Sequence, residues 1–245
     1  MLNVKKISAS WKDLKIFSKI SFTIEEGKTA AVLGPNGCGK TTLLSVIAGQ
    51  KEQDNKAGTI SLSGRNIEKG DRRIGCILQT YGIFPWLDVE KNIALPLRIA
   101  GRSRIEIENE INSALIRFNL SEHKKQYPAS LSGGEKQKLA LARTMVIRPQ
   151  LLLMDEPFSA IDTLTREELQ NFLRQLLSEN RITTLIITHS IEEAVFLADQ
   201  IHIMGKKPSV NLAGTVNVAR SFKERSDPSF LSQVIFIRNI LEGII

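Results

Sequence analysis

Residues 34–42 read GPNGCGKTT, between the apolar run AAVL at 30–33 and the helix-forming stretch LLSVIAGQ at 43–50. The pattern G-x-x-x-x-G-K-[ST], placed where a strand gives way to a helix, is typical of a phosphate-binding loop. Glycines remove the Cβ atoms that would keep backbone N–H groups away from phosphate oxygens, and the following helix adds the positive end of its dipole. The sequence therefore predicts a nucleotide site in this loop.

The chemistry of each loop side chain indicates the role that we expect for it. We expect Lys40 to bridge the β and γ phosphates, Thr41 to offer its hydroxyl to Mg²⁺, and Thr42 to hold a further phosphate. Backbone N–H groups complete the cradle. The candidate nucleotide-binding residues of this segment are Gly34, Pro35, Asn36, Gly37, Cys38, Gly39, Lys40, Thr41 and Thr42.

Working outward from the loop, the chain divides into three parts of one α/β domain over residues 1–245. The first part is rich in strand-like alternation, and the second, about 87–148, has the apolar spacing of helices and is predicted to be a helical insertion. From residue 150 onward strands and helices alternate, as in parallel βαβ units. Residues 227–245 predict one more amphipathic helix.

Acidic and polar side chains end the apolar strands that follow. In LLLMDEP at 151–157, Asp155 is a candidate Mg²⁺ ligand and Glu156 a candidate general base. Because ligands of α/β folds collect at the carboxyl ends of parallel strands, His189 after TTLIIT and Gln79 after IGCIL are expected at the same edge. His189 is then a candidate for orienting the γ-phosphate or the water, and Gln79 for ligating Mg²⁺ or the water. Surface acids in a loop and a structural histidine are the alternatives.

The sequence LSGGE at 131–135 predicts a second anion site. Ser132 and Glu135 form a capping-box pattern, but Gly133 and Gly134 in the first turn each cost about 1 kcal/mol relative to Ala. Bare N–H groups and a serine hydroxyl at a positive helix end suit a phosphate, so Ser132, Gly133, Gly134 and Glu135 are candidate nucleotide-binding residues. One nucleotide does not easily use two cradles on one chain. We therefore infer that ATP is held between two copies.

Taken in order, GPNGCGKT, a glutamine after a strand, LSGGE, LLLMDEP, SAID and the histidine of ITHS resemble the ATP-binding subunit of ABC transporters over residues 1–204. The resemblance implies a P-loop NTPase core with an N-terminal antiparallel β part and an inserted helical subdomain. It implies an ATPase that uses ATP and Mg²⁺. Trp11 then occupies the place of the aromatic that stacks on adenine, and residues 159–162 correspond to the loop that carries signals across the dimer.

A narrower resemblance links IFPWLDVEKNIALPL, PFSAIDTLTREELQ and THSIEEAVFLADQIHIM to importers of the nitrate, sulfonate and taurine group, which includes pyrimidine-precursor systems. It implies an ATP-driven homodimer on the cytoplasmic face of the membrane, under permease subunits that a solute-binding protein supplies. Residues 81–86 are then the expected permease contact. The alternatives are a soluble ABC ATPase acting on nucleic acid or ribosomes, an exporter subunit, and an unrelated P-loop kinase or GTPase.

Composition agrees with these expectations. The 245 residues are 42% hydrophobic and 24% charged, as in ordinary globular proteins. Without a long apolar run or a secretory signal, we expect a chain that stays in the cytosol, where Cys38 and Cys76 set no disulfide framework. The net charge of +7 is spread along the chain and favours polyanions only weakly, so no nucleic-acid partner is expected.

Overall fold

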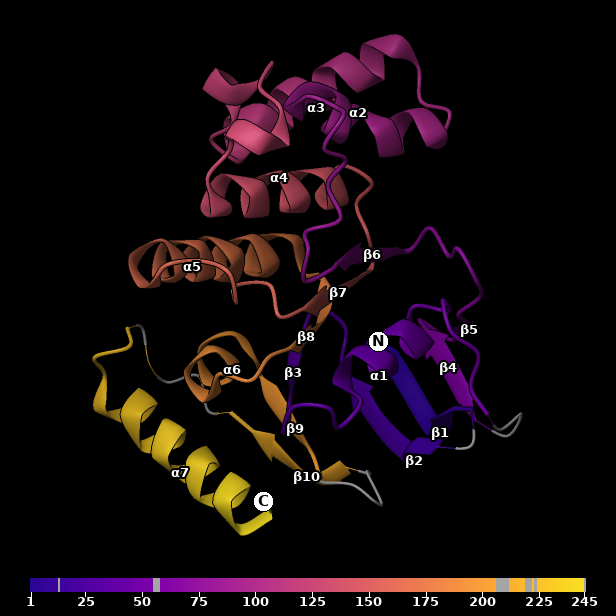
Figure 1. The fold of residues 1–245 in the computed structure, drawn as a ribbon, viewed down its shortest axis with the longest axis vertical. Helices are drawn as coiled ribbons and strands as arrows, with labels where there is room; N and C mark the ends of the chain where they lie inside the picture. The colour runs from indigo at the N-terminus through magenta and orange to yellow at the C-terminus, as the bar shows by residue number, and fades with distance from the viewer. Residues whose placement is uncertain (13, 55–57, 206–211, 219–221, 223, 245) are drawn as a thin grey trace.

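Two β-sheets organise the chain in a computed structural model that describes residues 1–245 except 13, 55–57, 206–211, 219–221, 223 and 245 (Figure 1). The first sheet has the strand order β2-β1-β4-β5 and is antiparallel. Its strands are β1 (Leu2–Trp11), β2 (Leu14–Ile24), β4 (Thr59–Leu62) and β5 (Arg65–Asn66). Alternating buried and exposed residues along β2 fit a sheet with one face on the core and the other in water.

The second sheet has the order β10-β9-β3-β8-β7-β6, and its strands from β9 to β6 pair in parallel. Its members are β3 (Thr29–Leu33), β6 (Ile74–Ile77), β7 (Leu151–Asp155), β8 (Thr183–Ile187), β9 (Gln200–Met204) and β10 (Leu212–Asn217). Every residue of β3, β7 and β8 is buried, which explains why these strands read as continuous apolar runs. The edge strand β10 pairs antiparallel with β9.

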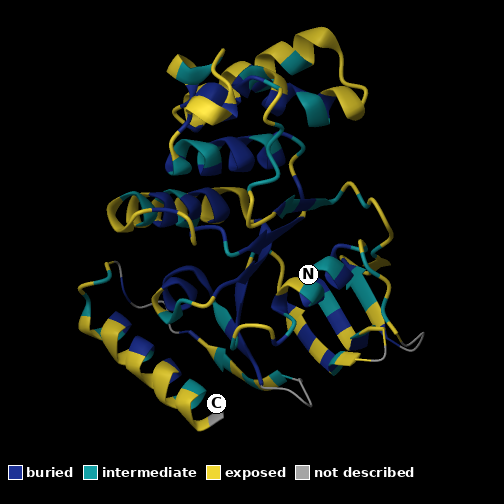
Figure 2. Cartoon of the chain, in the orientation of Figure 1, coloured by how far each residue is buried: buried dark blue, intermediate teal, exposed yellow. Residues whose placement is uncertain are grey.

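The two faces of the parallel sheet belong to different cores. Leu151 and Leu153 pack with α1 (Lys40–Ile47) and the antiparallel sheet, whereas Leu152 and Met154 pack with the helices of the other face. Successive side chains on a strand point to opposite faces, so β7 supplies both cores. The central strands β3, β7 and β8 of this sheet form the buried centre of the molecule in Figure 2.

Helices cover the face of the parallel sheet that points away from the antiparallel sheet, and further helices extend above it in Figure 1. Next to the sheet lie α5 (Thr163–Asn180) and α6 (Ile191–Leu197), and the C-terminal α7 (Pro228–Ile244) packs on α6. Between β6 and β7 the chain forms α2 (Val89–Ile99), α3 (Arg104–Arg117) and α4 (Gly133–Met145), with 3₁₀ turns at Ser121–His123 and Pro128–Ser130.

These helices fall in the stretches where helices are predicted. Of the predicted tail 227–245, residue 245 lies outside the described residues. No helix in the described part of the chain is long and apolar enough to cross a membrane.

Candidate nucleotide site

The parallel pairing brings four chain segments to one edge of the second sheet. Val32 of β3 and Asp155 of β7 both pair with Ile187 of β8, so these three strands end at the same level. β6 lies beside β7 in the same direction. The residues directly after the strands, including the phosphate-binding loop, Glu156, His189 and Gln79, therefore gather at this edge.

The loop between β3 and α1 has a backbone that requires glycine. Gly37 and Gly39 have φ angles of +75° and +103°, and a Cβ on Gly39 would lie 2.4 Å from Cγ2 of Ile16. The buried Lys40 ammonium donates hydrogen bonds to the carbonyls of Gly34 at 2.8 Å and Pro35 at 3.1 Å. Its charge is thus held inside the loop, where it can meet a phosphate.

Other loop residues contribute in different ways. Asn36 and Gly37 are exposed at the tip, and Thr41 is exposed on the first turn of α1. The Cys38 side chain is buried in the core shared with the antiparallel sheet, and its backbone N–H donates to the Pro35 carbonyl at 3.4 Å. Thr42 is half-buried.

Asp155 and Thr41 lie in contact beneath the loop. Burial raises the pKa of Asp155 above its ordinary value, while a hydrogen bond from Thr41 and the charge of Lys40 lower it and the charge of Glu156 raises it further. Only 5% of Asp155 is exposed. A carboxylate that loses hydration and keeps a hydroxyl beside it is suited to a cation.

Glu156 stands at the centre of a small polar group. Its Oε2 lies 3.4 Å from Nδ1 of His189 and accepts a hydrogen bond of 3.5 Å from Nε2 of Gln79. The backbone of Glu156 has φ +46°, a left-handed conformation that costs a non-glycine residue about 1–2 kcal/mol. The Glu156 N–H donates to the Ile187 carbonyl at 2.9 Å, which holds that conformation.

Residues 132–135 form the predicted helix start. Ser132 caps α4, its N–H donates to Glu135 at 2.7 Å and its hydroxyl accepts from the Glu135 N–H at 3.3 Å. The backbone N–H of Ser132 holds the pKa of Glu135 below its usual range.

Within one copy, this cap does not reach the phosphate-binding loop. In Figure 1, α4 lies with α2 and α3 in the upper part, whereas α1 lies beside the antiparallel sheet below. The structure thus brings together the predicted loop residues, Asp155, Glu156, Gln79 and His189, and leaves residues 132–135 apart from the phosphate-binding loop.

Trp11 lies at the end of β1 and is 64% exposed, so it is not a core residue. The Lys51 ammonium lies over its ring at 5.1 Å from the centroid. An aromatic face left open at the surface is available for stacking on a base. The sequence pattern gives no sign of Lys51 as a neighbour, because the contact joins residues far apart in the chain.

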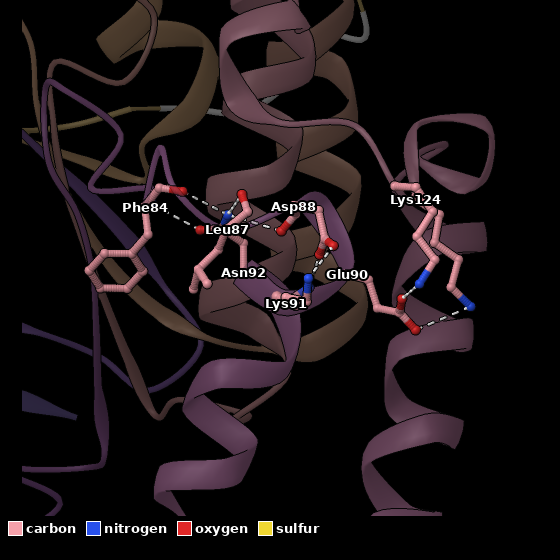
Figure 3. A network of polar contacts seen from close by, with 8 residues as sticks. Phe84, Leu87, Asp88, Glu90, Lys91, Asn92 and Lys124 are labelled. Atoms are coloured by element: carbon pink, nitrogen blue, oxygen red, sulfur yellow. Dashed lines mark hydrogen bonds and ion pairs between the residues drawn. The ribbon is translucent and has the colours of Figure 1, made fainter.

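In the segment 81–86 after Gln79, residues 81–84 are half-buried and Pro85 and Trp86 are exposed, and several contacts hold the segment in place. The Asn92 side chain is fully buried and bonds Phe84 through both N–H and C=O, at 2.9 Å and 3.1 Å, and the Leu87 carbonyl at 2.8 Å (Figure 3). Arg143 donates to Gly82 and lies 4.7 Å from the Phe84 ring centroid. Trp86 next to Phe84 is 69% exposed.

Comparison with known proteins decides the family. The family model described as "ABC transporter" matches residues 17–159, more than half of the chain. The chain belongs to the ABC transporter family. Its predicted family, α/β fold class and ATPase activity are thereby confirmed.

Individual relatives show which members of the ABC transporter family this chain resembles. The taurine import ATP-binding proteins TauB of Escherichia coli O157:H7, of Escherichia coli K12 and of Shigella boydii serotype 4 are each 37% identical over 240 residues, 95% of this chain and 93% of theirs. Among solved structures, the dimeric ATP-binding cassette MJ0796 in a post-hydrolysis state with ADP and Pi is 25% identical. Its TM-score is 0.77, over 91% of this chain and 100% of that one.

Proposed function

We propose that this chain is the ATP-binding and ATP-hydrolysing subunit of an importer, in which two copies clasp ATP and drive uptake of a small solute of the taurine, sulfonate, nitrate or pyrimidine-precursor type. The observation that carries the proposal is the convergence of Lys40, Asp155, Glu156 and His189 at one sheet edge in a chain that resembles taurine importers over 95% of its length. The proposed location is the cytoplasmic face of the membrane.

Nucleotide binding falls to the loop and to Trp11. The backbone N–H groups of residues 36–39 surround the phosphates, and Lys40 exchanges its bonds to the Gly34 and Pro35 carbonyls for phosphate oxygens. Thr42 adds a hydroxyl at the start of α1. The exposed Trp11 ring stacks on adenine.

The residues at this edge fit Mg²⁺. The Thr41 hydroxyl, the Asp155 carboxylate and the Gln79 amide oxygen are hard oxygen donors, which Mg²⁺ prefers. No group of three or more His, Cys, Asp or Glu residues that could hold a metal occurs in the described chain. A magnesium ion bound through nucleotide phosphates needs only one or two carboxylates, so the set is sufficient. When bound, Mg²⁺ neutralises the charge that develops on the phosphates.

For hydrolysis, Glu156 acts as the general base on a water in line with the γ-phosphate. Its carboxylate is four-fifths buried and is held between His189 and Gln79, so it has one orientation rather than many. His189, at 3.4 Å, orients the carboxylate and the γ-phosphate. A positioned base contributes about 10²–10⁴-fold to such a rate.

The partner copy completes the site. Ser132, Gly133 and Gly134 present a hydroxyl and bare N–H groups at the N-terminus of α4, and Glu135 keeps Ser132 in place through the capping box. Within one copy, this cradle lies away from the phosphate-binding loop (Figure 1). Two copies arranged head to tail would bring each cradle onto the other's ATP.

The permease contact is assigned to residues 81–86. Exposed aromatic residues are enriched at protein interfaces, and Trp86 is presented on a segment that Asn92 and Arg143 fix in advance. The segment begins two residues after Gln79, so a movement of the permease contact is transmitted to the ATP site.

The test is affinity isolation of the tagged chain from detergent-solubilised membranes with Mg-ATP. We expect a multi-spanning permease to be recovered, and Trp86→Ala to lose it while keeping basal ATP hydrolysis. Ile99→Ala, an equally exposed apolar residue at the end of α2, serves as the matched control. Recovery of ribosomes or DNA in place of a membrane protein would overturn the importer assignment.

A further inference from the structure

Glu193, in the first turn of α6, is a buried acid that the mechanism above does not use. It is only 6% exposed, and its Oε1 is buried without a hydrogen-bond partner. Burial raises the pKa of Glu193 to about 7, while a hydrogen bond from Thr188 and the charge of Arg166 lower it and the charge of Glu156 raises it. An acidic side chain placed so needs a reason beyond folding, because buried polar groups are normally satisfied.

The local sequence predicts a different position for this side chain. Ser190 and Glu193 have the S-x-x-E spacing of a capping box, like Ser103 and Glu106 at α3. At α3 the glutamate reaches back to the cap N–H at 2.8 Å. At α6 the Ser190 N–H donates instead to the Thr188 hydroxyl at 3.1 Å. The Glu193 side chain therefore does not accept the Ser190 N–H, as a full capping box would require, and it points inward.

Arg166 of α5 faces Glu193 from the other side. Its Nε is also buried without a partner, and its Nη2 donates to the Ile161 carbonyl at 2.5 Å. Between the two side chains lies a cavity of about 40 Å³, whose lining includes Glu156, Ser159, Arg166, Thr188, His189 and Glu193. That volume is enough for a water bridging the two unsatisfied atoms.

We propose that Glu193 and Arg166 are a positioning pair that fixes the loop of His189 and the loop of residues 159–162 against Glu156. Glu193 holds Thr188, the neighbour of His189, and Arg166 holds Ile161 in the loop after Glu156. The pair joins them across the cavity. This assignment rests on the proposed role of Glu156 as general base and adds the device that keeps both loops in register with it.

A positioning role predicts a defect in turnover without a defect in ATP binding. Glu193→Gln keeps the shape and removes the charge. We expect it to lower the kcat of the full-length chain about tenfold with the KM for ATP within about twofold, because the lost interaction affects the reacting geometry alone. Arg166→Gln should behave in the same way.

The double variant tests whether the two residues act as one unit. If they do, Glu193→Gln with Arg166→Gln loses about tenfold and not the hundredfold product of two independent losses. Glu192→Gln is the matched control, since Glu192 lies in the same turn but is exposed and pairs with Arg238 at 3.4 Å. It should keep native kcat. Thermal unfolding of each variant separates loss of fold from loss of position.

Two results would overturn the pair. One is native kcat in Glu193→Gln, and the other is a hundredfold loss in the double variant. Glu156→Gln, measured alongside, keeps the two proposals distinct. If Glu156→Gln stalls while Glu193→Gln is native, only the positioning pair fails, whereas native turnover in Glu156→Gln removes the general-base assignment itself.

Discussion

The structure predicts different effects for the same substitution, glycine to alanine, at the two glycines at the start of α4. A Cβ on Gly134 would lie 2.6 Å from Cγ2 of Thr165 on α5, too close without movement of the two helices or of that methyl group. A Cβ on Gly133 would meet nothing nearer than 3.4 Å, the carbonyl oxygen of Ala160. Gly134→Ala therefore overpacks the α4–α5 contact, and Gly133→Ala does not.

The magnitude follows from comparing the two variants directly. Each replacement gains the same helix propensity of up to about 1 kcal/mol, which cancels in the difference. What remains is the cost of overpacking, about 1–3 kcal/mol. We expect the free energy of unfolding of Gly134→Ala to lie below that of Gly133→Ala by this amount, from urea unfolding with equal slopes for both variants. Equal stabilities would refute the packing explanation for Gly134.

Gly133 also has the more direct functional consequence. Because its Cβ meets no close contact within one copy, a loss of ATP-dependent dimer in a stable Gly133→Ala variant would point to the partner's nucleotide. Local packing therefore explains the glycine at position 134, whereas the space around Gly133 is open within one copy. The sequence alone assigns both glycines to phosphate binding.

Three further predictions concern the nucleotide site and its surroundings. Trp11→Ala should raise the KM for ATP about three- to tenfold, a stacking loss of about 1 kcal/mol, without changing the melting temperature of the protein, because the ring is exposed; steady-state kinetics and calorimetry check both. Lys40→Ala should abolish ATP binding in isothermal titration, since no other described cation is held by the Gly34 and Pro35 carbonyls. The pKa of Glu193 is raised to about 7, so its contribution to stability is complete below the unfolded pKa and is lost as pH rises through 7. In urea titrations, the free energy of unfolding of the native chain minus that of Glu193→Gln should fall by about 2 kcal/mol between pH 5.5 and 8. A difference that stays constant over this pH range would contradict the raised pKa of Glu193.

Much of the fold and the nucleotide site follows from local patterns. A glycine loop between a strand and a helix, and acids directly after an apolar strand, carry their meaning within a few residues. The capping box of Ser132 and Glu135 is likewise a short-range pattern and forms as predicted. These features are predictable because the physics that fixes them is local.

What the sequence does not provide depends on contacts between distant segments. The S-x-x-E pattern at Ser190 predicts an exposed cap, yet Glu193 turns inward because Thr188 takes the cap N–H and Arg166 of α5 faces it. The contact of Gly134 with Thr165 joins two helices that no periodicity places together. The edge strand β10 is absent from the predicted elements, since its sequence LAGTVN has small and polar residues between Leu212 and Val216 and gives only a weak alternation of hydrophobicity.

The central claim is that Glu156 drives hydrolysis of an ATP held between two copies of this chain. The most direct measurement follows phosphate release and molecular mass of purified Glu156→Gln in Mg-ATP. The account predicts a loss of at least about a hundredfold in phosphate release, with ATP still bound and the mass of two copies. Native phosphate release, or a single copy with ATP bound, would contradict it.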